Sequence, residues 1–129
     1  MPEYSFCEFK RCCNENPERV QILYEPERDA KLHFGLKSKT AIKNFIANDG
    51  LEDEDLIFQN SKEWEKNPDK SFKIFVDAYE FRSRYKRGYI AFMYNPKTGY
   101  WIIKSFKLSK NNNFALANAL SRAGMIGDV

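Results

Sequence analysis

The sequence predicts one α+β domain over residues 1–129, in which an antiparallel sheet ends in a C-terminal β-hairpin and packs against two or three helices. Three observations favour this class. The length of 129 residues is that of a typical domain. A composition of 43% hydrophobic and 16% aromatic residues is sufficient for a core. Apolar residues recur at strand spacing in some segments and at helical spacing in others.

Runs of β-branched and aromatic residues predict three short strands in the N-terminal third. Turn-forming residues, Asn and Pro above all, separate the first two strands, and an acidic Pro-containing segment follows the second. The predicted strands span residues 4–10, 19–25 and 31–36, with turns at 14–17 and 25–29.

The middle of the chain predicts a helix over 39–47, capped by Ser38 and ended by Asn48-Asp-Gly50. Its apolar residues fall at helical spacing. The acidic run 52–55 is expected in a loop or in the first turn of a helix. After a short buried piece at 56–58, the capping-box spacing of residues 60–63 predicts a one- or two-turn helix that carries Trp64 and ends at Asn67-Pro68.

The C-terminal half predicts a strand over 72–81 and a hairpin of strands at about 88–94 and 100–107. Pro96 presets φ for the intervening turn, and Gly99 supplies its left-handed residue. A last helix is expected over 114–123, with Gly124 at its end.

A four-residue loop over 96–99 fixes the register of the hairpin. Tyr89 then lies opposite Phe106. Ala91 likewise lies opposite Lys104. The face expected to pack on the helices carries Ile90, Phe92, Tyr94, Trp101, Ile103 and Ser105. The other face is expected to carry Tyr89, Ala91, Met93, Tyr100, Ile102, Lys104 and Phe106.

Charge is divided unevenly along the chain. Residues 1–69 hold 10 Lys/Arg and 15 Asp/Glu, a balance of −5, and residues 70–129 hold 11 and 3, a balance of +8. From Arg82 to Arg122 there are nine basic residues and no acidic one. This asymmetry indicates a polyanionic partner or an acidic surface on which to dock. A solvated face that keeps the protein soluble is the alternative.

Several classes of protein are disfavoured. Apolar runs are too short to cross a bilayer, no signal peptide is visible, and the three cysteines indicate reduced thiols, so we expect a cytoplasmic protein without a membrane partner. Neither a phosphate-binding loop nor a hydrolase motif is present. The spacing of Cys7, Cys12, Cys13 and His33 fits no common zinc pattern, so we expect neither a metal nor another cofactor.

Aromatic rings on a sheet, rimmed by cations, are suited to single-stranded RNA, because bases stack on rings while Lys and Arg meet phosphates. Rings that pack the second face of the sheet, covered by basic side chains, are the alternative. The residues expected to contact RNA are Arg84, Lys86, Arg87, Tyr100, Phe106 and Lys110.

Residues 79–110 also resemble the C-terminal end of RelE/HigB-like toxins. The resembling segments are Tyr79-Glu-Phe-Arg82, Tyr85-Lys-Arg-Gly-Tyr89-Ile-Ala-Phe92 and Trp101-Ile-Ile-Lys-Ser-Phe-Lys107-Leu-Ser-Lys110. The stretch Ile103-Lys-Ser-Phe-Lys107 is similar to the close of MqsR-type messenger-RNA interferases. The resemblance implies a small α+β fold and a metal-independent endoribonuclease of the toxin–antitoxin kind.

By this resemblance Arg82 and Lys107 are catalytic residues, and the hairpin geometry adds Tyr89 and Lys104. Two functions remain open. The first is RNA binding with toxin-like ribonuclease activity. The second is a non-enzymatic interaction or inhibitor protein, for example of a mobile element, whose acidic and basic surfaces dock partners, an acidic or antitoxin-like protein among them.

Overall fold

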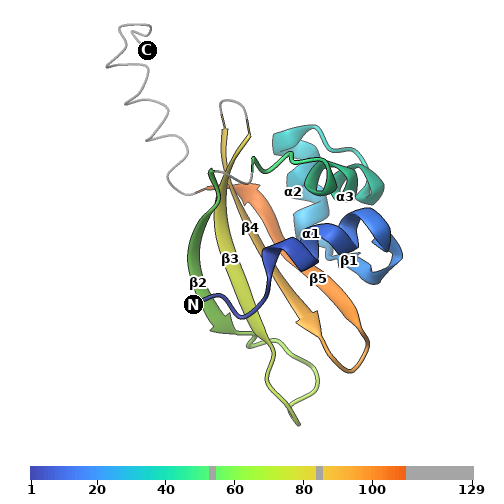
Figure 1. Cartoon of the computed structure of the whole chain (residues 1–129), viewed down its shortest axis with the longest axis vertical. Helices are drawn as coiled ribbons and strands as arrows, with labels where there is room; N and C mark the ends of the chain where they lie inside the picture. Colours follow the sequence, from blue (N-terminus) through green and yellow to red (C-terminus); the bar gives the residue numbers. More distant parts are fainter. Residues whose placement is uncertain (53–54, 84–85, 110–129) are drawn as a thin grey trace, which may run out of the picture.

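The computed structural model describes residues 1–52, 55–83 and 86–109, which form three α-helices, a short 3-10 helix and a five-stranded sheet (Figure 1). The helices are α1 (Phe6–Glu15), α2 (Tyr24–Phe34) and α3 (Lys39–Ala47), and the 3-10 helix η1 is Pro17–Arg19. The strands are β1 (Val20–Ile22), β2 (Ile57–Glu63), β3 (Phe75–Ser83), β4 (Lys86–Asn95) and β5 (Tyr100–Leu108). The predicted α+β class is confirmed.

The strands follow the order β1-β5-β4-β3-β2 across the sheet. β2 to β5 form an antiparallel meander, whereas β1 pairs with β5 in parallel, so the sheet is mixed. The predicted hairpin is present as β4 and β5. Asn95 pairs with Tyr100, and the Gly99 amide, at φ 76°, donates to the Asn95 carbonyl at 2.8 Å.

α1 occupies residues where a strand was expected, so that prediction was wrong. The Ser5 hydroxyl accepts a hydrogen bond from the Glu8 amide at 3.2 Å and caps the helix. Phe9 and Cys13 then fall four residues apart on the buried side. Helical spacing of these two side chains outweighed the aromatic residues that suggested a strand.

α2 replaces the predicted turn at 25–29 and most of the predicted strand at 31–36. Pro26 lies in the first turn, where a missing amide hydrogen costs no helical hydrogen bond. Gly35 ends the helix in the left-handed region at φ 67°, and the Leu36 amide donates to the Ala30 carbonyl at 3.2 Å. α3 begins after Ser38 and spans 39–47, as the sequence predicts.

β2 takes the place of the short helix predicted around Trp64. Its backbone pairs with β3 from Ile57 to Glu63, with a bulge at Gln59, and this tertiary pairing overrides the local capping-box pattern. The helix predicted over 114–123 lies outside the described residues.

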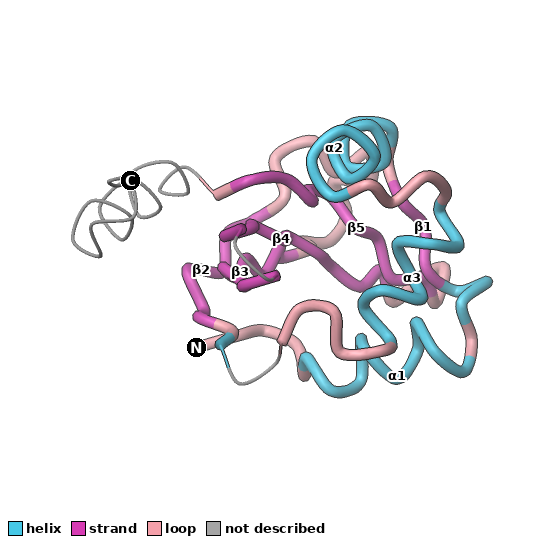
Figure 2. The backbone as a smooth tube through the Cα atoms, turned by 90° about the horizontal axis from the view of Figure 1, so that it is seen from above, coloured by secondary structure: helices cyan, strands magenta, loops and turns pink. Residues whose placement is uncertain are grey.

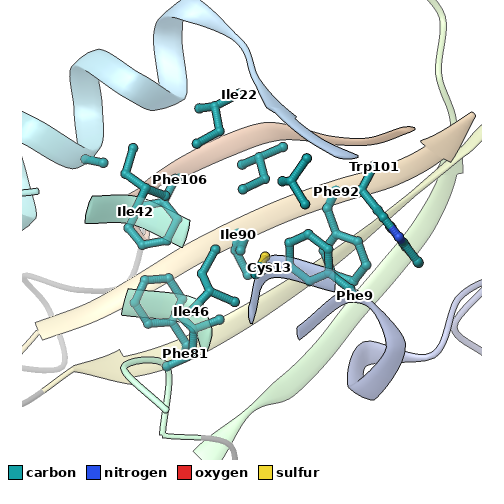
Figure 3. Packing of buried hydrophobic residues seen from close by; sticks show 14 of the residues in the cluster. Phe9, Cys13, Ile22, Ile42, Ile46, Phe81, Ile90, Phe92, Trp101 and Phe106 are labelled. Atoms are coloured by element: carbon teal, nitrogen blue, oxygen red, sulfur yellow. The ribbon is translucent and has the colours of Figure 1, made fainter. Parts of the chain in front are cut away.

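The main core lies between one face of the sheet and α1 and α3, and it also includes Ala30 of α2. We call this side of the sheet the helix face. Figure 3 shows its rings and aliphatic side chains in contact. Phe9 of α1 stacks on Phe92 of β4 with ring centroids 4.1 Å apart. Seen from above in Figure 2, α2 and α1 lie on opposite sides of the edge formed by β5 and β1. Within the described ranges, no helix is long and apolar enough to cross a membrane.

Candidate nucleic-acid interface

The opposite face of the sheet is floored by small and apolar side chains. Because neighbouring residues of a strand point to opposite sides, alternate residues of β3, β4 and β5 meet here. This groove face carries Val76, Ala78, Tyr89, Ala91, Met93 and Ile102, with Trp64 and Phe72 packed against one end. The sequence predicted this side of the hairpin from the same alternation, and the structure differs from that prediction at two residues, Ser105 and Phe106.

The two exceptions follow from a β-bulge at Lys104. Ala91 pairs with Ser105 and Phe92 pairs with Ile103, so Lys104 has no partner in the ladder. Ser105 is therefore turned to the groove face, not to the helices. Phe106 is turned the other way.

Phe106 is consequently not an RNA-binding residue. It pairs with Ile90 and is fully buried on the helix face, where its ring contacts those of Phe34, Phe45 and Phe81. A buried ring has no face left on which a base could stack.

Beyond the bulge, Tyr89 and Lys107 become direct partners across β4 and β5. The Lys107 ammonium lies 5.4 Å from the centroid of the Tyr89 ring, within the range of a cation–π contact. Burial raises the pKa of the Tyr89 hydroxyl above its ordinary value of 10, so at neutral pH the hydroxyl keeps its proton and can donate a hydrogen bond.

Two arginines lie beyond Tyr89 and Lys107, toward the end of β3 and the start of β4. Arg82 of β3 pairs with Arg87 of β4, and alternation places both on the same side as Tyr89. Arg82 forms a long ion pair with Asp55 at 4.0 Å and remains half-exposed. We call Arg82, Arg87, Lys107 and Tyr89 the basic end of the groove face. The structure thus brings three of the four predicted catalytic residues together, with Lys104 farther along β5.

Glu80, which is not among the predicted site residues, lies beside the basic end. It pairs with Tyr89 across the ladder and its side chain is 12% exposed. Its carboxylate accepts from Arg87 Nη1 at 3.2 Å and from the Ser109 hydroxyl at 2.8 Å. A carboxylate among cations and a tyrosine hydroxyl can accept a proton while its neighbours hold an anionic group.

Other predicted contacts lie apart from this cluster. Lys86 donates to the carbonyl of His33 and lies 5.6 Å from the Phe34 ring centroid, so it ties β4 to α2. Tyr100 stands at the opposite end of β5, with the Arg19 guanidinium 5.5 Å from its ring. The predicted residues Arg84 and Lys110 lie outside the described residues.

A groove of about 560 Å³ runs along the groove face beside the basic end. One wall is the first turn of α2 and the residue before it, and the other comprises the end of β2 with residues 64–66. Tyr89, Lys104 and Ser105 line it from the strands between.

No metal site is indicated, since no three His, Cys, Asp or Glu side chains of the described ranges converge. Neither a family model, nor a curated protein, nor a solved structure matches this chain.

Proposed function

We propose that the protein binds single-stranded RNA across the groove face and cleaves it at the basic end without a metal ion. The observation that carries the proposal is the clustering of three cations, a tyrosine hydroxyl and a shielded carboxylate on one side of two paired strands. The resemblance of residues 79–110 to RelE/HigB-like toxins implies the same activity.

Binding rests on the charge of this surface. Arg82 and Lys107 can each meet a phosphate, and Lys104 adds a third cation at the margin of the groove. Tyr89 offers a ring for an unstacked base, which a single strand provides and a duplex does not.

Cleavage would use the 2′-hydroxyl of the RNA itself as nucleophile. Glu80 takes the proton of the 2′-hydroxyl, and the 2′-oxygen forms a bond to phosphorus. Arg82 and Lys107 stabilise the charge on the pentavalent phosphate. The bond from phosphorus to the 5′-oxygen breaks, and Tyr89 protonates that oxygen. The products are a 2′,3′-cyclic phosphate and a 5′-hydroxyl, so neither water nor a cofactor is consumed.

The test of binding is fluorescence anisotropy of a labelled RNA 12-mer over a salt series. We expect affinity to fall steeply with salt, and Lys107→Ala and Lys104→Ala each to reduce the slope by about 0.7. Lys39→Ala is the matched control, because it removes the same charge from the first turn of α3, on the helix-face side. Salt-independent binding, or an equal loss in the control, would remove the RNA proposal and favour a protein-docking role.

The test of cleavage is incubation of a long transcript with the full chain in chelator. We expect Glu80→Gln and Tyr89→Phe each to slow cleavage by about 10²- to 10⁴-fold, with RNA affinity changed much less. An intact transcript at high protein concentration, with RNA binding retained, would leave a binding protein and dismiss the ribonuclease.

A further inference from the structure

We propose that the groove beside the basic end is a base pocket, which receives one unstacked base of the bound RNA while the adjoining phosphate lies on Lys107 and the arginines. This inference rests on the proposed function. The inference adds a binding place for the base to the proposed function, and it names Trp64 as the residue that would recognise the base.

The shape of the groove fits such a ligand. Small side chains form its floor, with Ala78, Ala91 and Ser105 contributed by three adjacent strands. Larger residues rise on both sides. Its volume of about 560 Å³ lies in the range of pockets that bind small organic ligands.

Two half-buried aromatic side chains line the groove. Trp64 packs against the apolar floor at one end, and Tyr89 stands where the groove meets the basic end. Since Tyr89 belongs to both, a strand held by its phosphate at Lys107 carries its next base directly over the groove. Stacking on such rings contributes to affinity whatever the base.

The charges around the groove favour the base of a nucleotide inside the groove and its phosphate at the basic end. The two walls carry three carboxylates, those of Glu25, Glu63 and Glu65, and two ammonium groups, those of Lys62 and Lys66, whereas Lys104 lines the groove from β5. Carboxylates repel a phosphate, but they accept hydrogen bonds from the ring and exocyclic N–H groups of a base. The walls therefore favour the base inside, and the cations of the basic end favour the phosphate outside.

The wall that carries Trp64 is held in place by its own hydrogen bonds. The Trp64 amide donates to the Ile74 carbonyl at 2.7 Å. The buried Asn67 side chain donates to the Phe72 carbonyl at 2.9 Å and accepts from the Asp69 amide at 3.0 Å. A wall fixed before binding loses little entropy when the base enters.

The test compares an RNA 12-mer with a 12-mer of the same length and charge that has abasic riboses. We expect the full chain to bind the abasic strand about 5- to 150-fold more weakly, with the same salt slope. Trp64→Ala should weaken binding of the intact strand alone, and Trp64→Phe should restore part of the loss. Leu32→Ala, an exposed apolar residue of α2 outside the groove, is the control and should change neither.

The chain has two tryptophans, and the other, Trp101, is 9% exposed, so quenching of fluorescence by the intact strand but not by the abasic one reports on Trp64. Equal affinity for both strands with the salt slope intact would overturn the base pocket and leave RNA binding in place. Loss of binding to both strands, or binding independent of salt, would overturn the proposed function itself.

Discussion

Tyr89 and Lys107 are direct partners across β4 and β5, with the ammonium 5.4 Å from the centroid of the ring. A contact of this kind at a partly exposed site is worth about 0.5–1 kcal/mol. We expect a double-mutant cycle of Tyr89→Leu and Lys107→Met, measured by urea unfolding, to give a coupling energy of that size. Lys104→Met should be additive with Tyr89→Leu, since Lys104 forms no cation–π contact in the described part of the chain. Additivity of the first pair would contradict the contact.

Asp77 anchors the segment before α1. Its fully buried carboxylate accepts from the amides of Glu3 at 3.0 Å and Tyr4 at 2.9 Å. Asp77→Ala leaves these two amides without a partner. We expect each to lower the free energy of unfolding by about 1–3 kcal/mol. Limited proteolysis should then cut near residue 5 faster than in the parent protein. Unchanged cleavage and stability would mean that water replaces the carboxylate at no cost.

Gly88 faces a ring at very short range. A Cβ added there would overlap the Phe81 ring. We expect Gly88→Ala to destabilise the protein by about 1–3 kcal/mol because the ring has to shift within a packed core. Gly88→Ala combined with Phe81→Leu should recover part of the loss, and its failure to do so would place the strain elsewhere. Thermal unfolding measures both.

Cys13 and Cys7 should differ in reactivity. Burial raises the pKa of the Cys13 thiol from about 9 to about 12, whereas Cys7 is exposed. At pH 8 we expect iodoacetamide to label Cys7 in the folded protein, and Cys13 only after unfolding, as mass spectrometry of tryptic peptides would show. Rapid labelling of Cys13 at pH 8 would contradict its burial.

The same thiol makes stability depend on pH. Its pKa is higher in the folded state than in the unfolded chain, so its contribution is complete below about pH 9 and is lost as pH rises toward about 12. Burial also raises the pKa of Tyr4 and Tyr79, which adds a slope of the same sign. In urea unfolding between pH 8.5 and 11, Cys13→Ala should show a shallower decline than the parent protein. Equal slopes would rule out the thiol as a contributor.

The sequence predicted α3 and the β4–β5 hairpin correctly, because short-range signals determine both. Ser38 and the turn at 96–99 act within a few residues, and the helix and the hairpin formed where the sequence placed them. The strand expected over 4–10 was wrong although the signal for a helix is equally local: aromatic residues suggested a strand, but the capping-box pattern of Ser5 and Glu8 begins α1.

Tertiary pairing explains the other errors. Residues 60–63 would suit a helix in isolation, but β3 offers them a complete ladder. Glu80 could not be assigned to the site, because its partners Arg87 and Ser109 reach it only after the strands have paired. The bulge did leave a trace in the sequence: Ile103 and Phe106 are three residues apart, and two strand residues at that separation share a face only if an extra residue lies between them.

Because Lys104 is the extra residue of the bulge, its side chain can change without affecting the pairing of β4 and β5. Lys104 has no cross-strand partner, so a chain from which it was removed could close the ladder regularly, with Ser105, Phe106 and Lys107 still facing as they do now. Such a chain would keep its interior and lose one positive charge. Position 104 can therefore be substituted, or even deleted, and the charge beside the groove changed, while the strand pairing and the core stay the same.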